Sequence, residues 1–200
     1  MDKKPINVKD DDPSTGYDAV SNAFMAARSD VGAARVMAWA EELGSGATVL
    51  DIGAGHGSPL TPPLLTAGLR VWAIEPSPRL AATHRSAFPD IPVACEPIQD
   101  STFFDRSFDA ALMIGVIFLF TEDQQRQTFR HISLALRPGG QLLFSAPWQT
   151  GSWEDVLTKR PSLSLGRDAY TALLQEAGYR LIAEHDDEGG NHYYQAALGS

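Results

Sequence analysis

The sequence has a single cysteine, Cys95, among its 200 residues. One thiol cannot form an intrachain disulfide, and it cannot supply the several cysteines of a structural zinc site. Long apolar runs are missing too. The longest candidate, 110–120, is about half as long as the roughly 20 residues that a membrane-spanning helix needs. We therefore expect neither a disulfide framework nor a bound metal, and no membrane partner.

Basic residues are few and scattered. The chain has 16 Lys and Arg against 25 Asp and Glu, which gives a net charge of −9. Proteins that bind phosphate backbones cluster positive charge, and here no basic run exceeds Lys3-Lys4. The first residues, MDKKPINVKDDD, lack the apolar stretch of a secretory signal. We expect a cytoplasmic protein that does not bind nucleic acid; a monomer and a homodimer both stay open.

What the chain does have is an alternation of short apolar segments with helical patterns. Strands joined by helices form right-handed βαβ units and a parallel sheet. Two further strands, joined by a short polar link, suit an antiparallel hairpin at the end. The pattern predicts an α/β fold with a doubly wound, Rossmann-like, seven-stranded sheet that is mostly parallel. Strands are predicted at 47–52, 69–74, 93–95, 108–114, 141–146, 180–185 and 192–198, and helices at 59–67, 78–88, 123–136 and 168–176.

A glycine-rich segment, VLDIGAGHG at 49–57, follows the first predicted strand and precedes a helix. Glycines there let the backbone turn tightly and approach a ligand closely. A dinucleotide loop of the form GxGxxG would need glycine at position 58, which is Ser58, and a phosphate loop would need a Gly-Lys pair, which is absent. Asp51, two residues before Gly53, can face an ammonium group. The spacing therefore favours a ligand with an amino-acid end over a pyrophosphate.

An acidic residue, Glu75, ends the second predicted strand about 20 residues beyond the loop. A carboxylate at that place can accept hydrogen bonds from both hydroxyls of a ribose. The loop and Glu75 together indicate a nucleoside site at the carboxyl ends of the strands. The alternative is a plain turn beside a solvated strand end.

These motifs resemble those of class I S-adenosylmethionine-dependent methyltransferases. The resemblance rests on VLDIGAGHG at 49–57, VWAIEPSP at 71–78, SFDAALMIGVIFL at 107–119 and LRPGGQLLFS at 136–145. It covers about 47–148, and the C-terminal hairpin also fits the family's seven-stranded sheet. Two later segments, SLSLGRDAY at 162–170 and DEGGNHYY at 187–194, are similar to a group of small bacterial methyltransferases of unassigned substrate.

The resemblance implies a division of the chain and a set of cofactor contacts. Residues 1–15 would be a flexible tail before a single methyltransferase domain at 16–200. That domain would contain a helical lid at 16–46, a cofactor-binding core at 47–148 and a C-terminal helix and hairpin at 149–200. The cofactor would be S-adenosyl-L-methionine, contacted by Tyr17, Arg28, Asp51, Gly53, Ala54, Gly55, Gly57, Glu75, Pro76, Ile98, Gln99 and Gly115.

Two of these contacts are more specific. Arg28 can bind the methionine carboxylate through its guanidinium, or it can be a solvated helix charge. The family often places an acid and a small residue after the third strand to hold adenine, whereas this chain has EPIQD at 96–100. Ile98 can pack on the adenine, and either Gln99 or Asp100 can meet its amino group.

Candidates for the chemistry are few. His192 is the candidate general base, with a purely structural role in the hairpin as the alternative. His56, Trp148 and Tyr193 are expected to line the substrate pocket. Phe118 is expected in the core, and Trp153 is a further candidate for the pocket wall. His84 and His131 lie on predicted helices and are expected at the surface.

The expected function is methyl transfer from S-adenosylmethionine to a small-molecule acceptor by in-line displacement. The sequence leaves open whether the acceptor atom is oxygen, nitrogen, sulfur or carbon. One alternative is a module that binds S-adenosylmethionine or S-adenosylhomocysteine without catalysis. A nicotinamide-dependent oxidoreductase is a weaker alternative, because Ser58 interrupts the dinucleotide motif and a Tyr-x-x-x-Lys pair is absent.

Overall fold

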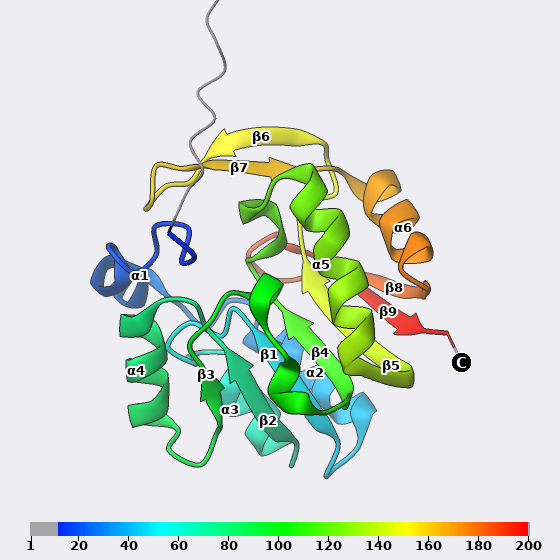
Figure 1. Cartoon of the computed structure of the whole chain (residues 1–200), viewed down its shortest axis with the longest axis horizontal. Coiled ribbons are helices and arrows are strands. Elements are labelled where there is room, and N and C mark those ends of the chain that lie inside the picture. Colours follow the sequence, from blue (N-terminus) through cyan, green and yellow to red (C-terminus); the bar gives the residue numbers. More distant parts are fainter. Residues whose placement is uncertain (1–11, 200) are drawn as a thin grey trace, which may run out of the picture.

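Seven strands form one central sheet in the computed structural model, which describes residues 12–199 (Figure 1). Their order across the sheet is β3-β2-β1-β4-β5-β9-β8. Neighbours among β1 to β5 are parallel, and β9 runs antiparallel to both β5 and β8. The predicted Rossmann-like sheet with its C-terminal hairpin is confirmed. The strands are β1 (Thr48–Ile52), β2 (Arg70–Ile74), β3 (Val93–Ala94), β4 (Phe108–Met113), β5 (Leu136–Ser145), β8 (Tyr179–Asp186) and β9 (His192–Leu198).

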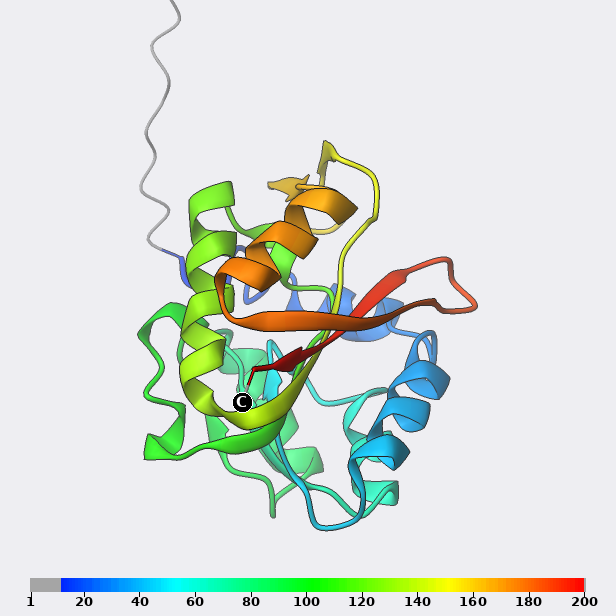
Figure 2. The same ribbon diagram turned by 90° about the vertical axis from the view of Figure 1, so that its right-hand side faces the viewer.

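Helices cover both faces of this sheet. Helices α5 and α6 lie on one side and α2 lies on the other (Figure 2). Short 3-10 turns, η1 (Ile98–Asp100), η2 (Phe103–Asp105) and η3 (Ile117–Leu119), fill the connections around β4. The helices are α1 (Ser21–Ala27), α2 (Ala33–Leu43), α3 (Thr61–Thr66), α4 (Pro78–Ala87), α5 (Glu122–Ala135) and α6 (Arg167–Glu176).

The central strands are apolar on both faces because both faces are covered. In β4, Ala110 and Leu112 pack with residues of α2 and α3. Ala111 and Met113 point the other way and pack with residues of α5 and α6. All four are fully buried. The alternation of side chains along a strand thus divides the core into two layers, one on each face.

Local signals explain where two helices begin. The Ser77 hydroxyl accepts a hydrogen bond from the Leu80 amide at 3.2 Å, and Pro78 is the first residue of α4. At α5, the Thr121 amide donates to Gln124 Oε1 at 2.9 Å while the Thr121 hydroxyl accepts from the Gln124 amide. Such reciprocal capping satisfies amides that the helix itself leaves unpaired.

The segment 16–46, expected as a helical lid, contains two helices, α1 and α2, and α2 begins after Gly32, whose φ is +85°. Strand β5 begins at Leu136, ahead of the predicted strand at 141–146. A two-stranded sheet of β6 (Gly151–Glu154) and β7 (Pro161–Ser164) was not predicted. Every residue of β6 is exposed, so the strand lacks the apolar alternation by which a strand is recognised.

The N-terminal residues that the structure describes lie against this hairpin. The predicted flexible tail falls mostly on residues 1–11, outside the described part of the chain. Residues 12–16 form a turn in which the Asp12 carboxylate accepts from the amides of Ser14 at 3.0 Å and Gly16 at 2.9 Å. Within residues 12–199, none of the helices has the length and apolarity to cross a bilayer.

Candidate active site

A cavity of about 580 Å³ lies at the carboxyl ends of β1, β2 and β4. That is the edge at which open α/β sheets bind their ligands. All twelve predicted cofactor residues line it, and so does Tyr193. They come together because neighbouring parallel strands end at the same edge of the sheet. Strand β1 pairs with β2 on one side, where Asp51 lies opposite Ala73, and with β4 on the other.

The glycine loop adopts a conformation that side chains would disturb. Gly53, Gly55 and Gly57 have φ values of +70°, +59° and +92°. A Cβ on Gly53 would overlap Val116, and a Cβ on Gly57 would approach the Phe88 ring. The loop is tied to β2, because the amide of Gly53 donates to the Ile74 carbonyl at 2.8 Å. Glycine is thus required for both the dihedral angles and the close packing.

Glu75 holds this loop from the end of β2. One carboxylate oxygen accepts from the Gly55 amide and the other from the Ser77 amide, each at 2.8 Å. The side chain is buried and lines the cavity. Burial raises the pKa of Glu75 to about 7 even though both amide bonds favour the ionised form. Each oxygen still has a lone pair with which to accept from a ligand hydroxyl.

Asp51 and Arg28 supply opposite charges to one part of the cavity. Asp51 is buried, and its carboxylate receives no hydrogen bond from the residues that the structure describes. Burial, reinforced by the nearby charge of Glu75, raises the pKa of Asp51 to about 7. Arg28 lies on the rim and favours ionised Asp51 electrostatically. It also forms no ion pair within the described part of the chain. Both groups are therefore free to engage a zwitterionic amino-acid end.

The turn η1 forms another wall of the cavity. Ile98 is buried there and presents an apolar surface, and Gln99 lies beside it. Asp100, the alternative to Gln99, does not line the cavity. An apolar surface with one neighbouring amide suits a purine ring and its amino group.

Aromatic side chains form a further part of the lining. Phe118 of η3, expected in the core, packs against the core and also lines the cavity, and Trp153 of β6, a candidate for the pocket wall, lines it too. The rings of Phe118 and Trp153 lie 5.3 Å apart, centroid to centroid. Asp155, just after β6, accepts a hydrogen bond from the Tyr17 hydroxyl at 3.0 Å. Asp155 was not predicted, because no pattern in the sequence marks the hairpin that carries it.

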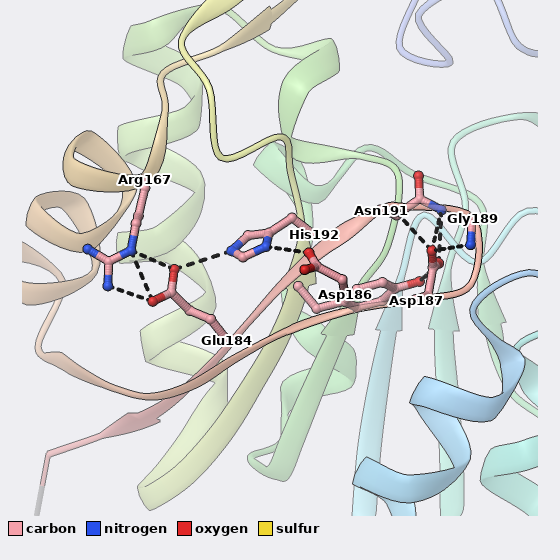
Figure 3. Close-up of polar contacts among 8 residues, drawn as sticks. Arg167, Glu184, Asp186, Asp187, Gly189, Asn191 and His192 are labelled. Carbon is pink, nitrogen blue, oxygen red and sulfur yellow. Dashed lines mark hydrogen bonds and ion pairs between the residues drawn. The ribbon is translucent and has the colours of Figure 1, made fainter.

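The hairpin β8–β9 contributes Tyr193 and the turn before it. The Tyr193 hydroxyl donates to Asp187 at 2.9 Å. Asp187 also accepts from the Asn191 side chain at 2.8 Å and from the Gly189 amide at 2.9 Å (Figure 3). Burial raises the pKa of Tyr193, and the bond to Asp187 raises it further, so the phenol stays protonated at neutral pH.

His192, the candidate base, does not line the cavity. Its ring lies between two carboxylates, with Nδ1 at 2.8 Å from Asp186 and Nε2 at 3.2 Å from Glu184, and Arg167 binds the far side of Glu184 (Figure 3). Its ring also stands edge-on to Tyr194. The structure thus places His192 in a hydrogen-bond network on the sheet, outside the cavity lining.

Two other predicted pocket residues lie outside the lining as well. The His56 ring packs edge-on against Phe24 at 5.9 Å, and burial lowers its pKa. Trp148 is 56% exposed. His84, expected at the surface, is fully buried with Nε2 at 3.3 Å from the Thr61 hydroxyl, and burial lowers its pKa to about 4. His84 therefore belongs to the packing of α3 against α4.

Comparison with protein families gives one match. Residues 49–140 match the family described as a methyltransferase domain. The match begins in β1 and ends in β5, and it includes the glycine loop and Glu75. No curated protein matches the chain.

Several solved structures are similar in fold. Magnesium protoporphyrin IX methyltransferase from Synechocystis, with bound S-adenosylmethionine, has a TM-score of 0.67 and 15% identity over 99% of this chain and 87% of its own. An amino pentose methyltransferase from Micromonospora echinaspora, also bound to S-adenosylmethionine, has a TM-score of 0.70 and 18% identity over 90% of this chain and 96% of its own. The 1,6-didemethyltoxoflavin-N1-methyltransferase of Burkholderia thailandensis has a TM-score of 0.67 and 20% identity over 94% of this chain and 91% of its own.

The family match covers the segment that builds the cavity, and the fold similarity extends over the rest of the chain. Residues 49–140 thus match the methyltransferase domain family, and the fold of the chain is that of the similar S-adenosylmethionine-dependent methyltransferases.

Proposed function

We propose that this chain transfers the methyl group of S-adenosylmethionine to a small-molecule acceptor. The observation that carries the proposal is the meeting of Glu75, Asp51 and Arg28 in one cavity with the glycine loop. A carboxylate for ribose hydroxyls lies beside a carboxylate and a guanidinium for an amino-acid end. S-Adenosylmethionine has both ends in one molecule. Three similar solved structures hold this compound or its demethylated product.

Each group has a distinct task in this proposal. Glu75 accepts from the ribose hydroxyls, and the amides of Gly55 and Ser77 fix its orientation beforehand. Asp51 binds the ammonium, and Arg28 binds the carboxylate. Ile98 packs on the adenine, and Gln99 bonds its amino group.

The transfer needs little covalent help from the protein. A lone pair of the acceptor attacks the methyl carbon, the carbon–sulfur bond breaks, and its electron pair stays on sulfur as neutral S-adenosylhomocysteine. The sulfonium is already a good leaving group, so holding nucleophile, carbon and sulfur in line in a cavity that excludes water supplies most of the catalysis. A proton on the accepting atom leaves to solvent or a base. We assign no such step to His192, since it lies outside the cavity.

The proposal is tested by calorimetric titration with S-adenosylmethionine, S-adenosylhomocysteine and NADH. We expect micromolar binding of the two sulfur compounds and none of NADH. Binding of NADH alone would refute the proposal and favour the oxidoreductase alternative. A protein that binds both sulfur compounds but consumes no S-adenosylmethionine across an acceptor screen would favour the binding module without catalysis.

A further inference from the structure

The proposed cofactor contacts leave part of the cavity wall unassigned. We call it the outer wall, and it consists of Phe118, Trp153, Asp155, Asn191 and Tyr193. Tyr17, a candidate cofactor contact, adjoins it through the hydrogen bond to Asp155. The side chains of the outer wall come from η3, from β6 and the residue after it, and from the β8–β9 hairpin. An acceptor that reaches the methyl group from outside would lie against them.

Aromatic rings dominate this outer wall. Trp153 and Phe118 contact each other at 51° between ring planes, and Trp153 keeps 36% of its surface exposed. Tyr17 is held in place by the edge of Phe24, at 5.3 Å between centroids, and by its bond to Asp155. Rings that are fixed by neighbours and exposed to a cavity bind flat ligands at low entropic cost.

The charged side chains that line the cavity are acidic, with the exception of Arg28. Among the described residues that line it, Arg28 is the only Lys or Arg, while Asp51, Glu75 and Asp155 are acidic. Although burial acts to raise the pKa of Asp155, hydrogen bonds from Thr158 and Tyr17 hold it below its usual value. Asp155 is therefore ionised at neutral pH. If Arg28 binds the methionine carboxylate, no cation of the lining remains for an anionic acceptor.

We propose that the acceptor is a flat aromatic or heteroaromatic small molecule that carries no negative charge and stacks against Trp153 and Phe118. This inference rests on the proposed function, because it takes the inner part of the cavity as the cofactor site. A neutral ring gains from the aromatic surface, and a cationic one gains also from ring faces and from the negative field. An anion meets that field without a partner.

Three indoles that share one ring test the charge preference. Tryptophol is neutral, tryptamine is a cation and indole-3-acetate is an anion near neutral pH. Each is titrated by calorimetry into the protein saturated with S-adenosylhomocysteine. We expect tryptophol and tryptamine to bind at least about tenfold more tightly than indole-3-acetate, because a tenfold ratio of Kd values requires only a modest difference in binding free energy. Equal or tighter binding of the acid overturns the proposal, and so does failure of all three to bind.

Two tryptophan variants test the place of binding. Trp153→Ala is expected to weaken tryptamine binding about tenfold and to leave S-adenosylhomocysteine binding unchanged. Trp148→Ala is the matched control, because Trp148 is exposed and lies outside the cavity. If tryptamine binds Trp153→Ala and wild type equally well, the proposed wall is wrong. Should Trp153→Ala unfold, Phe118→Leu takes its place with the same expectation.

These outcomes separate the two proposals. Wild-type protein that does not bind S-adenosylhomocysteine contradicts the proposed function itself. Two results contradict only the proposed nature of the acceptor, provided that the wild-type protein binds S-adenosylhomocysteine. One is tighter binding of indole-3-acetate than of the other two indoles, and the other is unchanged tryptamine binding in Trp153→Ala.

Discussion

Two buried carboxylates, Asp51 and Glu75, define the chemistry of the cavity at the scale of single residues. Both have a pKa raised to about 7, chiefly because both are buried. At mildly acidic pH the ligand-free protein therefore holds protons at these sites that the unfolded chain would release. A cationic ligand needs the ionised carboxylates, so its binding is coupled to the loss of those protons.

We expect the affinity for S-adenosylmethionine to increase as pH rises from about 5 to about 8. The free energy of unfolding of the ligand-free protein should instead decrease as pH rises. A raised pKa means that the folded state binds more protons than the unfolded state, so the contribution of these two carboxyl groups to stability is lost as pH rises from about 4 to about 7. Calorimetry at about pH 6, in buffers of different ionisation enthalpy, should show proton release on binding.

Asp51→Asn and Glu75→Gln serve as controls for this coupling. Each variant removes one titrating carboxylate, so each should release fewer protons than the wild type. Binding that releases no protons in the wild-type protein would contradict the prediction.

Glu75→Gln should lower the affinity for S-adenosylhomocysteine at least tenfold, or about 1.5–3 kcal/mol for a lost charge-assisted interaction. The amide keeps the shape of the side chain, but its NH₂ group cannot accept from the Gly55 or Ser77 amide. Glu176→Gln is the matched control, because Glu176 pairs with Arg126 and Arg130 on the surface. Equal affinities of the two variants, measured by calorimetry, would count against the ribose role.

Most of the site residues that the sequence predicted line the cavity, but the sequence did not give the direction of every side chain. Tyr193 lines the cavity, whereas its neighbour His192 does not. Successive side chains of a strand point to opposite faces, and the edge-on contact of His192 with Tyr194 places those two on the other face. Which of two adjacent candidates meets the ligand depends on which face of the strand β9 turns to the cavity.

At the scale of elements, the strand ends opposite the cavity are joined by a polar network. Asp109 of β4 accepts from the amide and the hydroxyl of Thr48 in β1, both at 2.8 Å, and pairs with Arg137 in β5. Although burial acts to raise it, the bonds to Arg137 and Thr48 lower the pKa of Asp109 to about 2. The network therefore stabilises the sheet without touching the cavity.

Asp109→Asn should cost about 1 kcal/mol of stability at neutral pH, since the site is partly exposed, and leave cofactor affinity unchanged. A lowered pKa contributes stability above the unfolded value of about 4, and the contribution is lost as pH falls towards 2. Urea denaturation at about pH 7 and about pH 3 should show a smaller difference between variant and wild type at the lower pH. A difference that grows in acid would contradict this account.

The N-terminal segment is fastened to two other elements. The Tyr17 hydroxyl bonds Asp155 after β6, and Asp18 accepts from the Ser77 hydroxyl at 2.7 Å and the Arg79 amide at 3.0 Å at the start of α4. Phe24 and Arg28 of the same segment also line the cavity.

Tyr17→Phe removes the bond to Asp155 and should weaken S-adenosylmethionine binding about threefold to tenfold, mainly through faster dissociation. Stopped-flow displacement measures that rate. Tyr179→Phe is the matched control, since the Tyr179 hydroxyl is buried and has no partner among the described residues. An unchanged dissociation rate in Tyr17→Phe would show that the bond does not hold the segment over the ligand.

For the whole molecule, ligand binding and folding are linked. A ligand that binds only the folded chain at a hundred times its Kd adds about 2.7 kcal/mol of stability. For a chain of this size, that raises Tm by about 5–10 °C. We expect this shift with S-adenosylhomocysteine in thermal unfolding, a smaller one in Glu75→Gln at the same concentration, and none with NADH.

The sequence by itself determined the order of strands and helices, the glycine loop and the acid at the end of β2. Those features depend on local periodicity and on residues that neighbouring parallel strands must bring to one edge. Only the tertiary structure decided which side chains close the cavity from outside. The exposed β6 strand leaves no hydrophobic pattern. Trp153 meets Phe118, and Asp155 meets Tyr17, only through contacts between segments far apart in the chain. Such contacts depend on packing between elements, which local sequence patterns do not encode.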